Sequence, residues 1–157
     1  MNLIPTEVSE NILQYMLGGH ATFCVKQDAT ETSDGGQVWY TIYESSGGAY
    51  ETTYFVYKVD GNKSYYAGYF TYNDLGKLKS LRESKKKKEV DDSVSKPLCV
   101  VLNSLKNKGV LPGNGIVHIY SDGRCSVCKR RLTDFNSIKD GVGPECRKKL
   151  MGMFQFR

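Results

Sequence analysis

The stretch GRCSVCKRRLTDFNSIKDGVGPEC, residues 123–146, decides how the C-terminal part of this chain folds. Cys125 and Cys128 have the spacing of a zinc knuckle, a tight turn from which two thiolates approach one ion at about 2.3 Å each. A Pro-Glu pair precedes Cys146 and is typical of a first helical turn. With a hairpin expected at residues 131–134, this order predicts a treble-clef-like zinc finger.

The motif leaves the fourth metal ligand open. In a treble clef it usually lies about one turn after the third cysteine, and that position here is Lys149. We predict Zn²⁺ as cofactor, with four ligands: Cys125, Cys128, Cys146 and His118, the last on the strand expected to enter the knuckle. The alternatives to His118 are Asp122, Asp134 or a water, and more remotely Cys99 or His20. Three free thiols without a metal are the alternative for the whole cluster.

This stretch resembles a short module shared by phage and bacterial proteins of uncharacterised function. The matching positions are Cys125, Cys128, Arg130, Leu132, Thr133, Asp134, Ser137, Gly141, Gly143, Pro144 and Cys146. Members of that family usually carry Gly after the second cysteine, where this chain has Lys129, and some carry His where it has Ser121. The resemblance implies a zinc-finger-like module on a small β-rich domain of phage type, and it implies little about activity.

The net charge of +5 is divided unevenly along the chain. Residues 1–76 carry three Lys/Arg and nine Asp/Glu, whereas residues 77–157 carry nineteen and eight. We therefore expect a polyanion to meet the C-terminal half, where phosphate contacts would give affinity without sequence readout. The predicted nucleic-acid-binding residues surround the cysteines: Arg124, Lys129, Arg130, Arg131, Arg147, Lys148 and Lys149.

Residues 20–73 predict an antiparallel, tyrosine-rich sheet. The expected strands are HATFCVKQ, QVWYTIYE, YETTYFVYKVD and SYYAGYFTYN, separated by turn signals such as SSGGA and DGNK. Nine of the eleven tyrosines fall between Tyr40 and Tyr72. Aromatic residues suit a half-buried pleated surface, so we expect ordinary cross-strand packing. A platform for single-stranded bases, or a protein-binding face, is the alternative.

Two helices are predicted to pack on this sheet. The first is PTEVSENILQYMLGG, residues 5–19, with Thr6 as its cap and Val8, Ile12, Tyr15 and Met16 on one face. The second is SVSKPLCVVLNSLKNKG, residues 93–109, with Ser95 as its cap. Its apolar positions follow helical spacing: Leu98, Val101, Leu102 and Leu105. A short strand, IVHIY, then leads into the cysteines.

The predicted fold class is α+β, an antiparallel sheet with packed helices and a C-terminal finger. Residues 1–76 form an acidic helix and sheet, and residues 77–92, with four lysines at 85–88, form a basic linker or loop. Residues 93–120 complete the body with a helix and a strand. Residues 121–157 form the zinc-finger-like module and a C-terminal tail.

The predicted role is that of a non-enzymatic accessory protein that binds nucleic acid non-specifically. No His-rich or paired-carboxylate constellation accompanies the cysteines, so we expect no enzyme activity. The alternative is a modulator or inhibitor of a host or phage enzyme, with a protein as partner. No apolar run is long enough for a membrane helix, and five unevenly spaced cysteines do not suggest a secreted disulfide framework. We therefore expect a cytoplasmic protein, in the host cytoplasm if it is viral.

Overall fold

The computed structural model describes residues 6–9, 11–29, 31, 35–45, 51–73, 75–83, 92–112 and 117–155, without the side chains of 6, 92–94 and 150–155. The chain forms an α+β fold around one seven-stranded antiparallel sheet of order β1-β7-β2-β3-β4-β5-β6. The strands are β1 Thr6–Glu7, β2 His20–Gln27, β3 Gly36–Glu44, β4 Glu51–Asp60, β5 Lys63–Asn73, β6 Arg82–Glu83 and β7 Val117–Ser121. The helices are α1 Ile12–Met16, α2 Asp92–Lys108, α3 Phe135–Asp140 and α4 Pro144–Gln155. None of these described helices is both long and apolar enough to cross a membrane.

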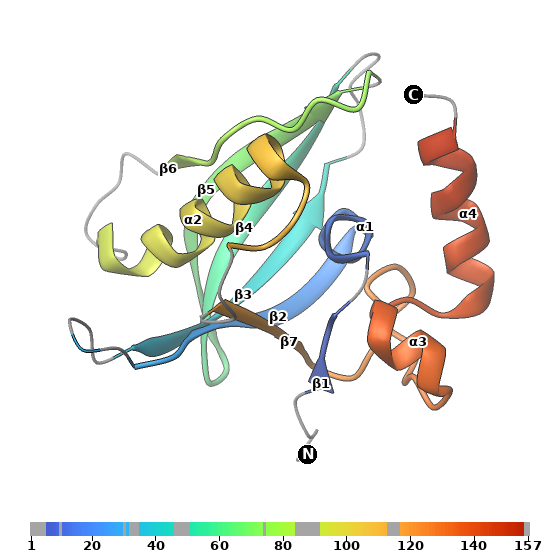
Figure 1. Ribbon diagram of the computed structural model, residues 1–157, viewed down its shortest axis with the longest axis horizontal. Helices are drawn as coiled ribbons and strands as arrows, with labels where there is room; N and C mark the ends of the chain where they lie inside the picture. The colour runs from blue at the N-terminus through green and yellow to red at the C-terminus, as the bar shows by residue number, and fades with distance from the viewer. Residues whose placement is uncertain are drawn as a thin grey trace.

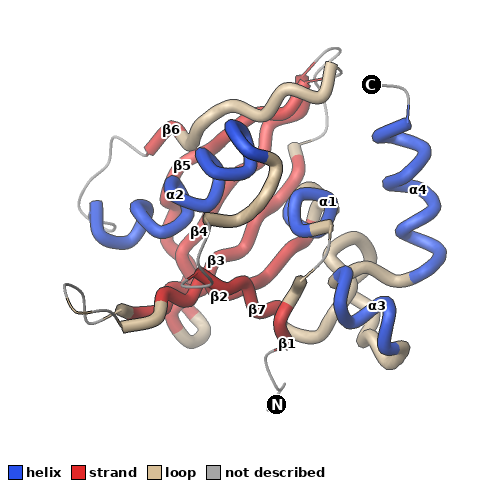
Figure 2. The backbone as a smooth tube through the Cα atoms, in the orientation of Figure 1, coloured by secondary structure: helices blue, strands red, loops and turns tan. Residues whose placement is uncertain are grey.

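The four strands β2 to β5 form a meander, which confirms the strands predicted for residues 20–73. Strand β7 does not follow at the end of this meander but lies between β1 and β2 (Figure 2). A β-bulge interrupts the pairing of β4 and β5 next to Gly68. Gly68 has φ +147, and a side chain there would meet the carbonyl of Arg82. Glycine therefore lets β6 approach the sheet edge.

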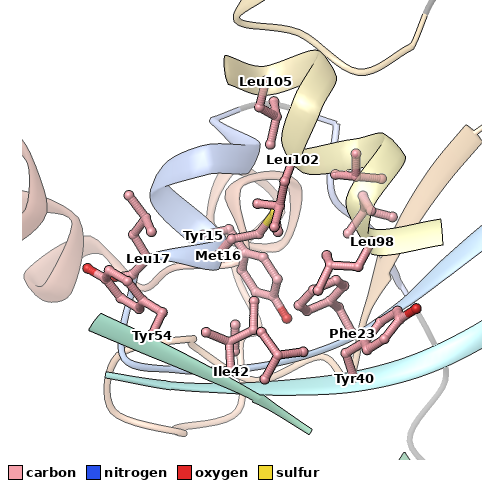
Figure 3. Close-up of a cluster of buried hydrophobic side chains, with 14 of the residues drawn as sticks. Tyr15, Met16, Leu17, Phe23, Tyr40, Ile42, Tyr54, Leu98, Leu102 and Leu105 are labelled. Carbon is pink, nitrogen blue, oxygen red and sulfur yellow. The ribbon is translucent and has the colours of Figure 1, made fainter. Parts of the chain in front are cut away.

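The hydrophobic core lies between one face of the sheet and helices α1 and α2, which both cover that face (Figure 1). The predicted apolar side of α2 is confirmed, because Leu98, Val101, Leu102 and Leu105 are buried. Figure 3 shows these leucines above the inward-facing side chains of the strands. Each such side chain contributes about 1.5–3 kcal/mol when it leaves water. These buried side chains therefore contribute much of the stability of the body.

Three of the core tyrosines are completely shielded from solvent. Tyr15, Tyr40 and Tyr54 are fully buried. The hydroxyl of Tyr15 donates a hydrogen bond to the carbonyl of Thr22 at 2.7 Å, and that of Tyr54 donates to the carbonyl of Leu17 at 3.3 Å. Because a buried hydroxyl is costly without a partner, these bonds also define where α1 sits on the sheet.

The first predicted helix is wrong in its extent. The structure begins the helix at Ile12, with Asn11 as its N-cap, and Thr6 is not a cap but part of β1. Strand β1 pairs with β7, and the amide of Val8 donates to the carbonyl of Ile119 at 2.8 Å. The backbone groups of residues 6–8 therefore find their partners in a strand more than a hundred residues away, which helical periodicity cannot reveal.

The second helix begins earlier than predicted, at Asp92, so Ser95 lies inside α2 and does not cap it. Its hydroxyl instead donates to the Glu83 carboxylate at 2.8 Å, which ties α2 to β6. Part of the stretch expected to be a linker, residues 77–83, runs along the sheet edge, and Leu78 is buried there opposite Tyr72. The lysines at 85–88 lie outside the described residues.

The opposite face of the sheet, here called the outer face, is covered by none of the described helices (Figure 1). Side chains alternate between the two faces along each strand, so residues paired with one another share a face. The register places on the outer face Thr22 and Cys24 of β2, Trp39 and Tyr43 of β3, Phe55 and Tyr57 of β4, Tyr66 and Tyr69 of β5, and His118 and Tyr120 of β7. This face carries most of the tyrosines that the core does not use.

Candidate metal centre

Three cysteines meet at one point of the structure. The Sγ atoms of Cys125, Cys128 and Cys146 all lie within 4.8 Å of one another. Cys125 and Cys128 come from the turn after β7, and Cys146 comes from the first turn of α4, as predicted. Thiolates that each lie about 2.3 Å from a tetrahedral ion are about 3.8 Å apart, so this spacing suits one metal ion. The three cysteines can therefore hold a metal.

The backbone of the knuckle is arranged around the sulfur of Cys125. The amides of Val127 and Gly143 each point at this Sγ from 3.4 Å. The amide of Cys125 donates to the carbonyl of Arg130 at 2.8 Å, and that of Lys129 donates back to the carbonyl of Cys125 at 2.9 Å. Donors aimed at a sulfur stabilise its negative form, which is the form that binds metal.

Lys129 has a left-handed backbone, with φ 66. This conformation favours glycine, the residue found here in the module that the stretch resembles. The lysine side chain offsets the strain with two contacts: its Nζ donates to Thr22 Oγ1 at 2.9 Å and lies 3.5 Å from Asp122 Oδ2. A residue that departs from the family pattern thus binds the knuckle to β2.

The environment shifts the two remaining thiols in opposite directions. The backbone amide of Arg130 lowers the pKa of Cys128, which is exposed. Burial raises the pKa of Cys146 to about 12. A buried thiol of this kind loses its proton when a cation is bound beside it, so metal binding at this site releases protons.

The segment that contains the cysteines, residues 122–155, is here called the cysteine module, and it packs on the sheet body. The amide of His20 donates to the carbonyl of Ser126 at 2.7 Å, and the amide of Ser126 donates to the carbonyl of Gly141 at 3.0 Å. Gly141 lies directly against the ring of Tyr15. Cys125, Val142 and Cys146 join the core cluster of the body. The described part of the cysteine module therefore packs directly against the sheet body.

The hairpin expected at residues 131–134 is reduced to one bridge between Arg124 and Arg131. Instead, the short helix α3 lies between the knuckle and α4. Asp134 is its N-cap, and its carboxylate accepts the amide of Ser137 at 3.3 Å.

The structure does not bring His118 to the cysteines, and this corrects the predicted ligand set. Its Nδ1 lies 2.9 Å from Glu7 Oε2 and its Nε2 lies 3.1 Å from Asp28 Oδ2, so both ring nitrogens are engaged. Hydrogen bonds to Glu7, and then to Asp28, raise the pKa of His118. Because His118 faces outward from β7, its side chain lies near the ends of the neighbouring strands and away from the knuckle that follows.

The other proposed ligands differ in their position. Asp122 accepts the amide of Arg124 at 3.1 Å, and Cys99 lies on α2 with its sulfur 3.9 Å from Glu83. His20 is in ring contact with Tyr43 at 6.0 Å. A cavity of about 240 Å³ opens onto the cysteines, and its walls include Thr133, Asp134 and Glu145. Of the carboxylates considered from the sequence, only Asp134 lines this cavity, which also offers room for a water.

The seven cations predicted to bind nucleic acid fall into two groups. Arg124 donates to the carbonyl of Lys129 at 3.1 Å, and Lys129 reaches Thr22 and Asp122. Arg147 forms an ion pair of 2.7 Å with the buried Asp140. The side chains of the other four are exposed and make no hydrogen bond or ion pair with another described residue: Arg130, Arg131, Lys148 and Lys149. The structure thus separates cations that hold the module together from cations that face solvent.

Sequence reasoning missed two features near the site. Glu145 and Thr133 line the cavity, although the sequence analysis assigned neither of them to the metal site. The uncovered outer face was considered only as an alternative to ordinary packing. The alternation of tyrosines along residues 54–72 was the available signal, because every second ring must face away from the helices.

Comparison with known proteins supports the cysteine module and leaves the body without a match. Residues 118–151 match a family described as a family of unknown function, DUF6011. No curated protein and no solved structure matches the chain. The matched segment begins on β7, contains all three cysteines and ends within α4. Over this segment the chain is similar to DUF6011.

Proposed function

We propose that the cysteine module is a treble-clef-like finger with one structural Zn²⁺ bound by Cys125, Cys128 and Cys146. The observation that supports it is the convergence of three sulfurs, two of them buried, with backbone amides aimed at one of them. The fourth position faces the cavity, where a water or the Asp134 carboxylate completes the tetrahedron. Thiolate ligands select zinc over magnesium or calcium, which prefer oxygen. The protein then belongs in a reducing compartment such as the cytoplasm.

Metal analysis tests this centre. The purified protein should contain one zinc per chain, and Cys125→Ser or Cys146→Ser should remove it. His118→Ala should leave the zinc content unchanged, because His118 is held by two carboxylates away from the cysteines. Asp134→Asn distinguishes the two fourth ligands, since reduced zinc affinity indicates the carboxylate and unchanged affinity indicates water. A protein without metal that keeps its three thiols free contradicts the proposal.

The role that we propose for this finger is non-enzymatic binding of nucleic acid in an accessory protein of phage type. Four cations carry this proposal: Arg130, Arg131, Lys148 and Lys149, which lie on one metal-bound module and face solvent. Their guanidinium and ammonium groups are available to phosphates, which contribute most of a non-specific affinity. The cavity beside the cysteines, at about 240 Å³, is smaller than the roughly 300 Å³ at which ligand sites begin, which favours a structural role.

A charge-reversal experiment tests the nucleic-acid role. Replacing Arg130, Arg131, Lys148 and Lys149 with Glu should weaken binding to duplex and single strands by more than tenfold at low salt. Each lost phosphate contact should also reduce the slope of log affinity against log salt by about 0.7–0.9.

The control carries the same change in net charge elsewhere on the surface: Lys63, Lys77, Lys96 and Lys106, all exposed, changed to Glu. This control should bind more tightly than the module variant. Equal affinities of the two variants would mean that only total charge matters, and the module would lose its assigned role.

A second candidate function, modulation of another protein, is favoured by one observation. A cavity of about 570 Å³ lies between α1 and the end of α2, lined by Ile12, Leu13, Leu105, Val110 and Leu111 among others. Val110 is exposed at its rim. Recovery of one stoichiometric partner, resistant to nuclease and abolished by Val110→Asp, would support this function.

A further inference from the structure

The outer face carries a continuous row of aromatic rings, here called the aromatic strip. It consists of His20 on β2, Tyr43 on β3, Phe55 and Tyr57 on β4, and Tyr66 and Tyr69 on β5. Ring centroids along the strip are 5.5–6.5 Å apart: His20–Tyr43 6.0 Å, Tyr43–Tyr57 5.7 Å, Tyr57–Tyr66 5.5 Å, Tyr66–Phe55 6.3 Å and Phe55–Tyr69 6.5 Å. The strip crosses four neighbouring strands.

The strip is accessible. Tyr43 is 45% exposed, and Phe55, Tyr57, Tyr66 and Tyr69 are half-buried against one another. None of the described helices lies over this face. Isolated apolar residues at a surface need no explanation, but a contiguous aromatic patch marks an interaction site.

The charges around the strip favour an anionic partner. On this face Glu51 forms an ion pair with Lys79 at 3.1 Å, and Glu7 and Asp28 both contact His118, at 2.9 Å and 3.1 Å. At the far end Arg82 pairs with Tyr69 across β6 and β5, so its side chain shares the outer face. Arg82 thus places a positive charge at the far end of the strip, where it can meet a phosphate.

The near end of the strip adjoins the cysteine module. His20, the first ring, binds the knuckle through its amide, which donates to the carbonyl of Ser126 at 2.7 Å. Lys129 reaches the same face, where its Nζ donates to Thr22 at 2.9 Å. The module that carries the solvent-facing cations thus begins where the aromatic strip begins.

We propose that the aromatic strip is a platform on which the bases of a single-stranded nucleic acid stack, with the sugar–phosphate chain running from the cysteine module toward Arg82. The proposal rests on the nucleic-acid role of the module and specifies its ligand. Bases stack on aromatic rings without regard to sequence, but only when they are not already enclosed in a duplex. Four strands about 4.8 Å apart span about 14 Å, which is room for about four nucleotides at 3.4 Å each.

Leucine substitutions test the platform, because leucine keeps apolar area and removes the ring. The variant with Tyr43, Tyr57 and Tyr66 changed to Leu should bind a labelled oligothymidylate of about 15 nucleotides at least tenfold more weakly than the wild type. Its affinity for a duplex hairpin should stay within twofold, because the module cations are intact. Trp39, the one tryptophan in the chain, lies on the same face, so its fluorescence should change when oligothymidylate binds and not when the hairpin binds.

The matched control is Tyr65→Leu. Tyr65 neighbours Tyr66 on β5 but pairs with Lys58, and thus belongs to the opposite face. This control should bind oligothymidylate as the wild type does. Thermal unfolding of each variant identifies any that fail to fold, and the single Tyr43→Leu variant, at the most exposed tyrosine of the strip, then replaces the triple variant.

The outcomes separate this inference from the function on which it rests. If the module charge reversal weakens all binding while the leucine variant binds oligothymidylate within twofold of wild type, the platform is wrong and the module's role stands. If the leucine variant changes only the oligomeric state, the face is occupied by a second copy and the platform is also wrong. If the wild type binds neither oligothymidylate nor hairpin at low salt, both proposals fail together.

Discussion

The sheet body and the cysteine module are held together by different means. The body buries most of the large apolar side chains, including Tyr15, Phe23 and Leu102, at under 2% exposure. The cysteine module contributes Val142 and two cysteines to the buried set, and its Phe135 is 68% exposed. An apolar core stabilises the first region, whereas the second brings together three cysteines that could hold a metal ion.

Core mutations and metal chelators should therefore destabilise different regions of the protein. A structural zinc site contributes on the order of 10 kcal/mol to a small finger. A body of this size is stabilised by many small contributions, of which a single core side chain is one. The two regions meet where Gly141 lies against Tyr15, where Ser126 bonds to β2, and where Cys125, Val142 and Cys146 join the core cluster of the body.

Removal of the metal should unfold the module and leave the body folded. Cys125→Ser, or chelation of the wild type, should make residues 122–155 sensitive to protease while strand signals in circular dichroism persist. Cys24→Ser is the control, because Cys24 is a buried cysteine of β2 outside the cluster. Equal protease resistance of the module with and without metal would remove the contrast between the two regions.

Truncation of a core side chain should destabilise the sheet body and leave the metal site intact. Leu102→Ala removes a fully buried side chain and should lower the free energy of unfolding by about 2–5 kcal/mol, with one zinc per chain retained. Leu75→Ala, at a residue 81% exposed, should cost nothing measurable in the same denaturant titration. Loss of zinc from folded Leu102→Ala protein would show that the two regions are coupled more tightly than their contacts suggest.

Substitutions at two glycines test how tightly the cysteine module packs against the sheet body. Gly141 and Gly123 have nearly the same backbone, φ 73 and φ 80, but a Cβ meets the ring of Tyr15 only at Gly141. Alanine at either position should cost about 1–2 kcal/mol for the left-handed conformation. Gly141→Ala should cost a further 1–3 kcal/mol or so for the displaced ring. A similar loss of unfolding free energy in both variants would mean that the Tyr15 ring moves aside at little cost and that the two regions are not tightly packed.

The smallest expected effect belongs to His118. Because its pKa is raised in the folded state, its bonds to Glu7 and Asp28 stabilise the protein fully below its ordinary pKa of about 6.5. This stabilisation is lost as the pH rises through the folded-state pKa. The wild type should exceed His118→Gln in stability by less than about 1 kcal/mol near pH 6, and the gap should close toward pH 9. A stability difference between wild type and His118→Gln that grows with pH would contradict the stabilising contact of His118 with Glu7 and Asp28.

Features encoded locally were predictable from the sequence. The four meander strands follow from alternating aromatic and β-branched residues between turn signals, and α2 follows from the spacing of Leu98, Val101, Leu102 and Leu105. The meeting of Cys125, Cys128 and Cys146 also follows from a short motif. In each case the residues that decide the structure lie within about 25 positions of one another.

Features that depend on distant partners were not predictable. Strand β1 has only two residues, and it forms a strand only because it pairs with β7. The partners of His118 are Glu7 and Asp28, about a hundred positions away, and only the strand order brings them together. Lys129 departs from the family pattern, and its contact with Thr22 compensates across the same distance. Pairing across such separations is decided by topology and not by local pattern.

The insertion of β7 between β1 and β2 has a consequence for synthesis of the chain on the ribosome. Until residue 121 has emerged, one long edge of β2 lacks its neighbour and β1 has nothing to pair with. An unpaired strand edge in a nascent polypeptide invites association with other chains. The last of the described strands to be translated thus completes the sheet and, a few residues later, brings Cys125, the first of the three clustered cysteines, so that closure of the body and assembly of the cluster begin almost together.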